Sequence, residues 1–252
     1  MIINNERMCT MENGMENSVL KVSPYGFSHK KIDELGATEY TLVSIALDTS
    51  GSVASYKDEL EECIRTVVAA CLKSPRADNL MLRIIDFNSK LTETHGFKPL
   101  GECNADDYTD FISPGGCTSL YDASVNAVEA LNVYGKNLSD NDYEANAILV
   151  VITDGCENNS TNTITQVTEA VAKIKKDESV ESIVTILVGV GVDQDSSNEL
   201  ERFKNDVDFT QYVGTKSIDS KTFARLAAFV SSSISSQSQA LGTNGPSQSL
   251  TF

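Results

Sequence analysis

YTLVSIALDTSGSVAS, from Tyr40 to Ser55, joins a short apolar run to a loop of small polar residues. The run from Tyr40 to Leu47 is rich in β-branched and apolar residues, which predicts a buried strand. Asp48 and two serines follow directly, so the polar residues lie where this strand ends. In open α/β sheets, ligands bind at the carboxyl ends of the strands. The stretch is therefore either the polar cap of a following helix or one half of a metal site.

The rest of the chain alternates between strand-like and helical patterns. Apolar runs predict further strands at residues 81–87, 91–100, 147–153, 182–190 and 209–213. The segments between them predict helices at residues 56–74, 119–135, 163–176, 196–204 and 219 to about 235. The first two of these strands form a hairpin, because only Asn-Ser-Lys lies between them, and Gly135 is expected to end the second helix. The sequence therefore predicts an α/β fold, with a mostly parallel central sheet, one antiparallel edge strand and helices on both faces.

The two ends of the chain differ in composition from its middle. Residues 1–20 are polar and rich in Asn and Met, so we expect a flexible N-terminal arm there. Residues 240–252 are expected to form a flexible C-terminal tail, and residues 38–235 a single domain. The Ser/Gln-rich stretch 230–239 is either the last turns of the final helix or the beginning of that tail.

Composition argues against several classes of function. The 252 residues carry a formal net charge of -16, with an isoelectric point near 4.5. Such a chain lacks the basic face that binding to nucleic acid requires. No apolar run approaches the roughly 18 residues that span a bilayer, so we expect no membrane partner. The opening residues lack the basic and apolar segments of a signal peptide. We therefore expect a cytoplasmic protein whose six scattered cysteines are reduced.

Three segments place oxygen-bearing side chains where strands or loops end. Asp48, Ser50 and Ser52 alternate in the first segment, so in an extended loop they point to the same side. Thr118 follows the glycine pair of PGGCTSLYDA, and Asp154 leaves the strand of VVITDGCEN. Carboxylate and hydroxyl oxygens are hard ligands that suit Mg²⁺, with Ca²⁺ or Mn²⁺ as alternatives. We expect the three hydroxyls to bind the ion directly, while the two carboxylates lie nearby or hold its waters.

Each segment alone has a simpler explanation. Serine, threonine and aspartate are common at helix N-termini, and Asp-Gly after a strand is a common turn. Capping does not explain why all three segments carry such residues at corresponding strand or loop ends. Other sites are disfavoured, because His29 and His95 lie too far apart for a zinc motif. The glycine-rich GVGVDQD, from Gly189 to Asp195, lacks the third glycine of a dinucleotide site.

The five candidate ligands together resemble the metal-ion-dependent adhesion site (MIDAS) of von Willebrand factor type A (vWA) domains. That pattern is D-x-S-x-S, then a distant threonine and a distant aspartate, and all five positions are filled here. The resemblance runs from about Thr41 to about Val230. It implies a Rossmann-like, three-layer fold with a metal at the C-terminal edge of the sheet. It also implies a partner whose Asp or Glu completes the coordination, and a last helix that moves between closed and open states.

Within this family, LDTSGS and GG-x-T-x-L-x-D-A look most like the stand-alone bacterial intracellular proteins of the TerY kind, which are associated with tellurite resistance. The resemblance implies a non-enzymatic adaptor that binds a partner's acidic residue through Mg²⁺, in a stress-response or AAA+-associated complex. Such relatives suggest an AAA+ ATPase, or a kinase or phosphatase of the same operon, as the partner. Two alternatives stay open. One is a Mg²⁺-dependent phosphoryl-transfer hydrolase, which Ser50 disfavours because a second acid is usual there. The other is a secreted adhesin, which needs a secretion signal.

Three further residues lie beside these motifs. Glu157 is expected to be a solvated loop acid, with an anionic rim to the metal site as the alternative. Cys117 and Cys156 each lie within two residues of a predicted ligand. They are expected to be unpaired small residues, and a redox pair that gates the site is the alternative.

Overall fold

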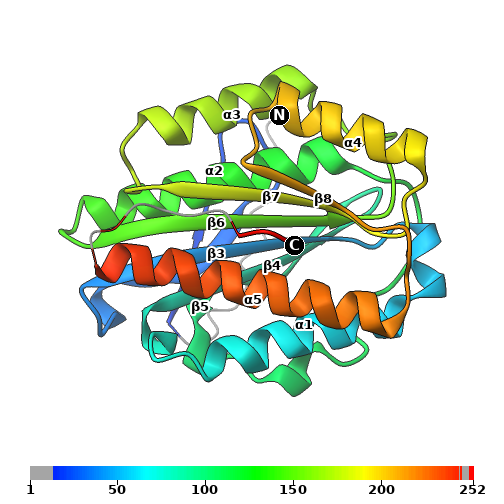
Figure 1. The fold of residues 1–252 in the computed structure, drawn as a ribbon. Coiled ribbons are helices and arrows are strands. Elements are labelled where there is room, and N and C mark those ends of the chain that lie inside the picture. Colours follow the sequence, from blue (N-terminus) through cyan, green and yellow to red (C-terminus); the bar gives the residue numbers. More distant parts are fainter. Residues whose placement is uncertain (1–13, 244, 246–249) are drawn as a thin grey trace, which may run out of the picture.

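The arrangement of the chain is seen in a computed structural model, which describes residues 14–243, 245 and 250–252. In this part of the chain, eight strands form one sheet in the order β1-β2-β5-β4-β3-β6-β7-β8 (Figure 1). The strands are β1 (Met15–Ser18), β2 (Phe27–Lys30), β3 (Glu39–Asp48), β4 (Leu80–Phe87), β5 (Leu91–Pro99), β6 (Glu144–Thr153), β7 (Ile183–Gly189) and β8 (Gln211–Gly214).

The centre of the sheet is parallel. β3 lies between β4 and β6, and β7 and β8 continue the same direction. β4 and β5 pair antiparallel, with Phe87 opposite Leu91, which confirms the predicted hairpin. β3 and β6 are buried on both faces, which is why both strands read as nearly continuous apolar runs. The predicted α/β fold with a mostly parallel sheet is confirmed.

The sheet extends beyond the edge expected from the sequence. β2 pairs parallel with β5 at His29 and Phe97, and β1 pairs antiparallel with β2. The ring of Phe27 meets that of Phe97 edge-on, with 6.1 Å between centroids. Residues 15–18, which the sequence placed in a flexible arm over residues 1–20, thus form a strand of the sheet. Residues 1–13 of that expected arm lie outside the described part of the chain. Strands this short and polar carry too little periodicity for the sequence to predict them.

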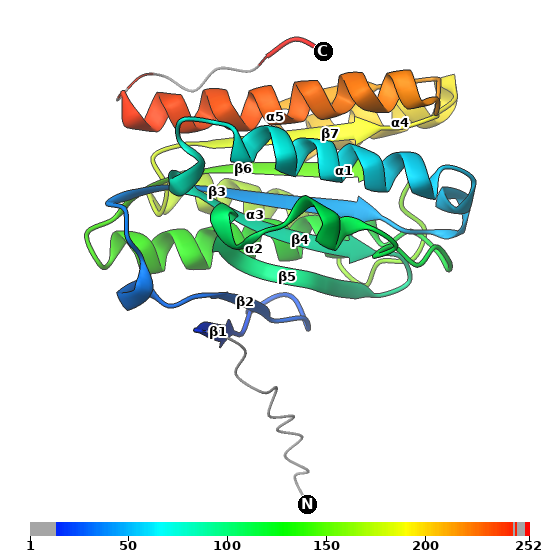
Figure 2. The same cartoon turned by 90° about the horizontal axis from the view of Figure 1, so that it is seen from below.

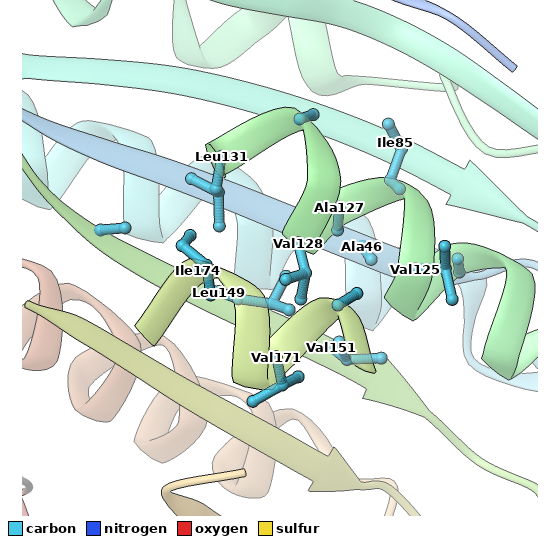
Figure 3. Packing of buried hydrophobic residues seen from close by; sticks show 14 of the residues in the cluster. Ala46, Ile85, Val125, Ala127, Val128, Leu131, Leu149, Val151, Val171 and Ile174 are labelled. Carbon is cyan, nitrogen blue, oxygen red and sulfur yellow. The ribbon is translucent and has the colours of Figure 1, made fainter. Parts of the chain in front are cut away.

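Five α-helices in the described chain cover the two faces of the sheet. They are α1 (Lys57–Leu72), α2 (Leu120–Ser139), α3 (Ile164–Lys176), α4 (Gln194–Asp206) and α5 (Ser220–Gly242). α2, α3 and α4 pack on one face, and α1 and α5 on the other, which gives three layers. Figure 2 shows α1 and α5 on one side of the central strands and α2 and α3 on the other. Figure 3 shows part of the apolar core between the sheet and the layer of α2 and α3. Residues of β3 and β6 there meet residues of the two helices: Ala46, Leu149, Val151, Val128, Leu131, Val171 and Ile174.

Gly135 does not end α2, which continues to Ser139. A Cβ at this position would lie 2.6 Å from Cγ1 of Val180 and 2.8 Å from the carbonyl oxygen of Ser179. The glycine therefore lets the segment before β7 pack directly on the helix. Close approach, and not helix termination, is the reason for a glycine at this position.

α5 continues to Gly242, so the Ser/Gln-rich stretch belongs to the helix and not to the tail. Beyond the helix, the ring of Phe252 meets Phe229 edge-on at 5.6 Å, and the guanidinium of Arg225 lies 4.7 Å from its centroid. Leu250 packs on the same core. The last residues of the expected flexible tail thus contact α5, because their apolar side chains reach the core on that face. Within the described part of the chain, no helix has the combination of length and apolarity that crossing a membrane requires.

Candidate metal site

Three loops meet at the carboxyl ends of the central strands. The loop after β3 binds the loop before α2 through backbone hydrogen bonds, from Gly51 N to Gly116 O at 3.2 Å and from Gly115 N to Thr49 O at 2.9 Å. The loop after β6 joins them through Asn158 N, which donates to Thr118 O at 3.1 Å. The topology therefore brings the three segments that carry the predicted ligands to one edge of the sheet.

Asp48 ends β3 and is buried, with 1% of its surface exposed. Its Oδ1 accepts a hydrogen bond from Ser50 N at 2.8 Å, and its Oδ2 accepts one from Thr153 Oγ1 at 2.6 Å. Burial raises the pKa of this carboxyl to about 6, although both hydrogen bonds oppose the rise, and the nearby charge of Asp154 adds to it. Asp48 is therefore a carboxylate whose ionised form lacks a compensating positive charge.

Ser50, Ser52 and Asp154 form a chain of polar contacts. The hydroxyl oxygens of Ser50 and Ser52 lie 3.2 Å apart, and Ser52 Oγ donates to Asp154 Oδ1 at 2.9 Å. The Tyr56 hydroxyl faces the same carboxylate. Burial raises the pKa of Tyr56 first, and the charge of Asp154 raises it further. Four of the five predicted ligands, Asp48 among them, thus lie in one electrostatically coupled group.

Thr118, the fifth predicted ligand, is tied by its backbone to the loop that carries Asp154. It is buried in the loop before α2, and its N–H donates to Asn158 Oδ1 at 2.8 Å. The N-cap position of α2 belongs to Ser119, and Ser50 stands at the N-cap of the short turn Gly51–Ser55. In the described structure, neither of these serines makes a side-chain capping bond. Helix capping therefore does not account for the hydroxyl residues at this edge.

The chemistry of this donor set fits a small hard cation. It offers two carboxylates and three hydroxyls, and the two carboxylates repel each other. Among the described residues, no three side chains of the His, Cys, Asp and Glu types come together as a metal site. A cation held here would consequently need the hydroxyl oxygens as ligands. Neutral hydroxyls would leave a divalent ion electrophilic, whereas more carboxylates would neutralise it.

Glu157 is not the solvated loop acid that the sequence predicts. Its carboxylate accepts hydrogen bonds from the backbone N–H of Tyr121 at 2.9 Å and of Asn159 at 2.7 Å, and from both the N–H and the hydroxyl of Ser160. Glu157 therefore shapes the loop after β6 and ties it to the start of α2. In the sequence, the one signal for this role is an acidic residue that is separated from TDG by a single cysteine and is followed by small polar residues.

Cys117 and Cys156 are unpaired and contact different elements. Cys117 N donates to Ser89 Oγ at 2.9 Å, on the hairpin turn. The thiol of Cys156 donates to Ser196 O at 3.9 Å, on α4. The structure thus supports the reading of both as unpaired residues.

Three residues beside the site were not predicted from the sequence. Thr153 holds the Asp48 carboxylate, Tyr56 faces Asp154, and Asn158 ties its loop to Thr118. None of them belongs to a repeated pattern in the sequence. Their roles become visible only when the loops are placed side by side.

Comparison with protein families agrees with this geometry. The family model of the von Willebrand factor type A domain matches residues 43–228, which is most of the chain. A search among curated protein sequences finds no significant match.

Several solved structures share the fold. The PilB minor pilin from Streptococcus sanguinis has 14% sequence identity and a TM-score of 0.59, with 86% of this chain and 66% of that chain covered. Proximal thread matrix protein 1 from the mussel byssus has 14% identity and a TM-score of 0.55, over 80% and 47% of the two chains. The pilus adhesin SpaC from Lactobacillus rhamnosus GG has 11% identity and a TM-score of 0.52, over 77% and 30%. This chain spans about two thirds or less of each of these proteins, and identities this low show a common fold alone.

Proposed function

The chain belongs to the von Willebrand factor type A family, and we propose that it is a Mg²⁺-dependent protein-interaction module that binds an acidic residue of a partner. Domains of this family commonly mediate protein–protein interaction, and a non-enzymatic role agrees with the family. The observation that carries the proposal is the coupled group at the sheet edge. There, Ser50, Ser52 and Asp154 are in contact, beside the buried carboxylate of Asp48.

Each residue has a definite task in this proposal. The hydroxyls of Ser50, Ser52 and Thr118 would be direct ligands of the ion, and Asp48 and Asp154 would accept hydrogen bonds from its waters. Bound in this way, Mg²⁺ would supply an electrophilic position that a carboxylate of the partner completes. Thr153 and Ser50 N hold the Asp48 carboxylate in place before the ion arrives, which lowers the cost of ordering the site.

The finer parts of the proposal rest on the motif resemblance. The TerY-like motifs favour a bacterial, cytoplasmic adaptor, with an AAA+ ATPase or a kinase or phosphatase as its partner. Ser50 stands where phosphoryl-transfer hydrolases usually carry a second acid, so hydrolysis is the weaker alternative. The structural neighbours named as a minor pilin and a pilus adhesin keep a secreted adhesin open as the other alternative.

The test is affinity capture from cells that produce the protein, with Mg²⁺ or with EDTA in the buffer. Ser52→Ala and Thr118→Ala should lose the partner that the parent chain captures in Mg²⁺. Ser55→Ala is the matched control, because Ser55 is an exposed serine of the same short turn. Among the described residues, its hydroxyl bonds only to Ser52 O. This variant should retain the partner.

Circular dichroism on the three variants shows whether each is folded. If the partner were captured equally in EDTA and in Mg²⁺, a metal-bridged carboxylate would not be the mode of binding. Turnover of a phosphate ester that Asp48→Asn abolishes would favour the hydrolase instead.

A further inference from the structure

A groove of about 270 Å³ lies between the first half of α1 and the first turn of α5. These helices pack side by side on one face of the sheet (Figure 2). Phe223 and Cys63 form the buried bottom of the groove, and Ala224 forms part of its wall. Pockets that hold drug-sized molecules measure roughly 300–1,000 Å³. The groove is therefore sized for a single long side chain.

The bottom of the groove is apolar. Phe223 and Cys63 are each 2% exposed. Burial raises the pKa of the Cys63 thiol to about 12, so the sulfur stays neutral and behaves as a small apolar group. An aliphatic stem laid along this surface would gain burial without losing hydrogen bonds.

The rim of the groove is acidic. Asp58, Glu59 and Glu62 line it, all on the first turns of α1. Glu62 is paired with Arg65, whereas Asp58 and Glu59 form no salt bridge within the described part of the chain. The nearest lysine on α1, Lys57, is instead held by Asp110 at 3.1 Å and by Glu61 at 3.7 Å. The rim therefore keeps a net negative charge.

We propose that this groove binds a lysine or arginine side chain of a protein partner. The aliphatic stem of such a side chain would lie on Phe223, and its cationic head would meet Asp58 and Glu59. Long basic side chains have this combination of an apolar stem and a charged end, and acidic or purely apolar side chains lack it. The net charge of -16 would speed the approach of a basic partner.

A buried side chain, Tyr56, connects the groove to the candidate metal site. The ring of Tyr56 lies 5.7 Å from that of Phe223, while the Tyr56 hydroxyl faces Asp154. In the combined mode of binding, a partner would present an acidic residue to the metal and a basic residue to the groove. This pairing of the two contacts rests on the proposed function, whereas occupation of the groove by a basic side chain does not need the metal.

The test uses the full chain labelled with ¹⁵N, in EDTA, titrated with the tripeptide acetyl-Leu-Arg-Leu-amide. The matched probe replaces arginine by citrulline, which has nearly the same shape and no charge. We expect the arginine peptide to shift amide signals at residues 58–66 and 220–224, and the citrulline peptide to bind at least threefold more weakly. The double variant Asp58→Asn/Glu59→Gln should lower the affinity for the arginine peptide by about three- to fivefold, which corresponds to the upper part of the free energies of exposed ion pairs.

Two further variants test whether the arginine peptide binds in the groove itself. Ala224→Leu should fill the groove and abolish the localised shifts, whereas Glu201→Gln, on α4 and the opposite face of the sheet, should leave binding unchanged. Equal binding of both peptides, or equal loss in Glu201→Gln, would show only general attraction to an acidic surface and overturn the proposal. Because the titration is done in EDTA, failure of the Mg²⁺-dependent function would leave this result standing.

Discussion

Two clusters of buried polar side chains lie at opposite ends of β3 and β6. At the carboxyl ends, Asp48 is surrounded by hydroxyl groups and lies close to a second carboxylate. At the amino ends, Thr41 of β3 is paired with Asn146 of β6, and Gln237 of α5 covers them. All three of these side chains are at most 1% exposed. The first cluster is charged, and the second is neutral.

The neutral cluster ties α5 to the sheet. Asn146 Nδ2 donates to Gln237 O at 2.6 Å, and Gln237 Nε2 donates to Ala147 O at 3.2 Å and to Ser182 Oγ at 2.9 Å. Every amide N–H₂ group in this set has a partner, whereas the side-chain oxygens of Thr41, Asn146 and Gln237 have none in the described structure. Its hydrogen bonds join elements of the fold to one another.

The difference between the clusters separates two uses of buried polarity. The N–H₂ groups of the neutral amides find acceptors already present in the fold, so the hydrogen bonds of the amino-terminal cluster serve to hold α5 on the sheet. Two neighbouring carboxylates cannot satisfy each other, because both are acceptors and both are negative. A cation bound there would offset this repulsion, which is the physical basis of the proposed metal site. The following predictions are ordered from the largest expected effect to the smallest.

Asp48→Asn should produce the largest effect. We expect Mg²⁺ affinity to fall by about 10- to 100-fold, the range typical of residues that hold the ligands or waters of a metal in place. The metal-free protein should become as stable or more stable, because a buried charge is removed and the amide oxygen still accepts a hydrogen bond. Calorimetric titration, with thermal unfolding with and without Mg²⁺, measures both quantities. Asp86→Asn is the control, because Asp86 is a partly buried aspartate near the end of the neighbouring strand β4. This variant should retain metal binding. An unchanged Mg²⁺-induced shift in Tm for Asp48→Asn would contradict the assignment.

Gln237→Ala should act on stability and leave the metal site intact. It removes the two hydrogen bonds that Gln237 Nε2 donates, so we expect a loss of about 1–3 kcal/mol in the free energy of unfolding. Mg²⁺ affinity should stay within about twofold of the parent value, since the two clusters lie at opposite ends of the strands. Urea denaturation and calorimetry give the two numbers. Gln239→Ala, at an exposed position of the same helix, should change stability by less than about 0.5 kcal/mol. A comparable loss there would show that the buried hydrogen bonds of Gln237 are not the cause of its effect.

Stability and metal affinity should both depend on pH through Asp48. Its folded-state pKa of about 6 lies above the value of 3.8 expected for an exposed aspartate. The folded, metal-free protein therefore binds the proton more tightly than the unfolded chain, and its stability falls as pH rises from 4 through about 6. Mg²⁺ requires the ionised carboxylate, so its apparent affinity should be constant above about pH 7 and fall about tenfold per unit below 6. Titrations between pH 5 and 8 check this, and Asp48→Asn should flatten both curves. A metal affinity that is independent of pH in the parent protein would contradict the role of Asp48.

Tyr56→Phe should have the smallest effect. The variant loses the hydroxyl that faces Asp154 but keeps the ring contact with Phe223. We expect Mg²⁺ affinity to fall by about two- to tenfold and the free energy of unfolding to change by less than about 1 kcal/mol. Calorimetric titration of the variant against the parent measures the change. A loss as large as that of Asp48→Asn would mean that Tyr56 takes part in binding the ion itself.

Much of the fold follows from local sequence patterns. The strands β3 and β6 and the hairpin β4–β5 were predicted because apolar runs are continuous where a strand is buried on both faces. The amphipathic face of α1 was predicted from helical spacing. β1 and β2 were missed because strands of four residues are too short to show a period. β2 is held instead by the contact of Phe27 with Phe97 of β5, which is distant in sequence. Gly135 was misread for a related reason: its neighbour Val180 is distant in sequence.

Some features of the candidate site also follow from the sequence, and others depend on the tertiary structure. The five predicted ligands stand at strand and loop ends, and the spacing of Asp48, Ser50 and Ser52 is a property of a single loop, so the sequence alone supplies it. Their occupation by a metal stays a prediction. The supporting contacts of Thr153 and Tyr56 join residues that no local pattern relates.

The sequence by itself determined the α/β alternation, the acidic surface and the oxygen-bearing residues at three strand or loop ends, because each depends on neighbours along the chain. Only the tertiary structure decided which of those oxygens meet and that the carboxyl of Asp48 has a raised pKa. It also decided that one side of the polar end of α5 is buried and that a groove opens between α1 and α5. These properties depend on the distance between segments and on the exclusion of water, and both arise only when the sheet and its two helical layers have assembled.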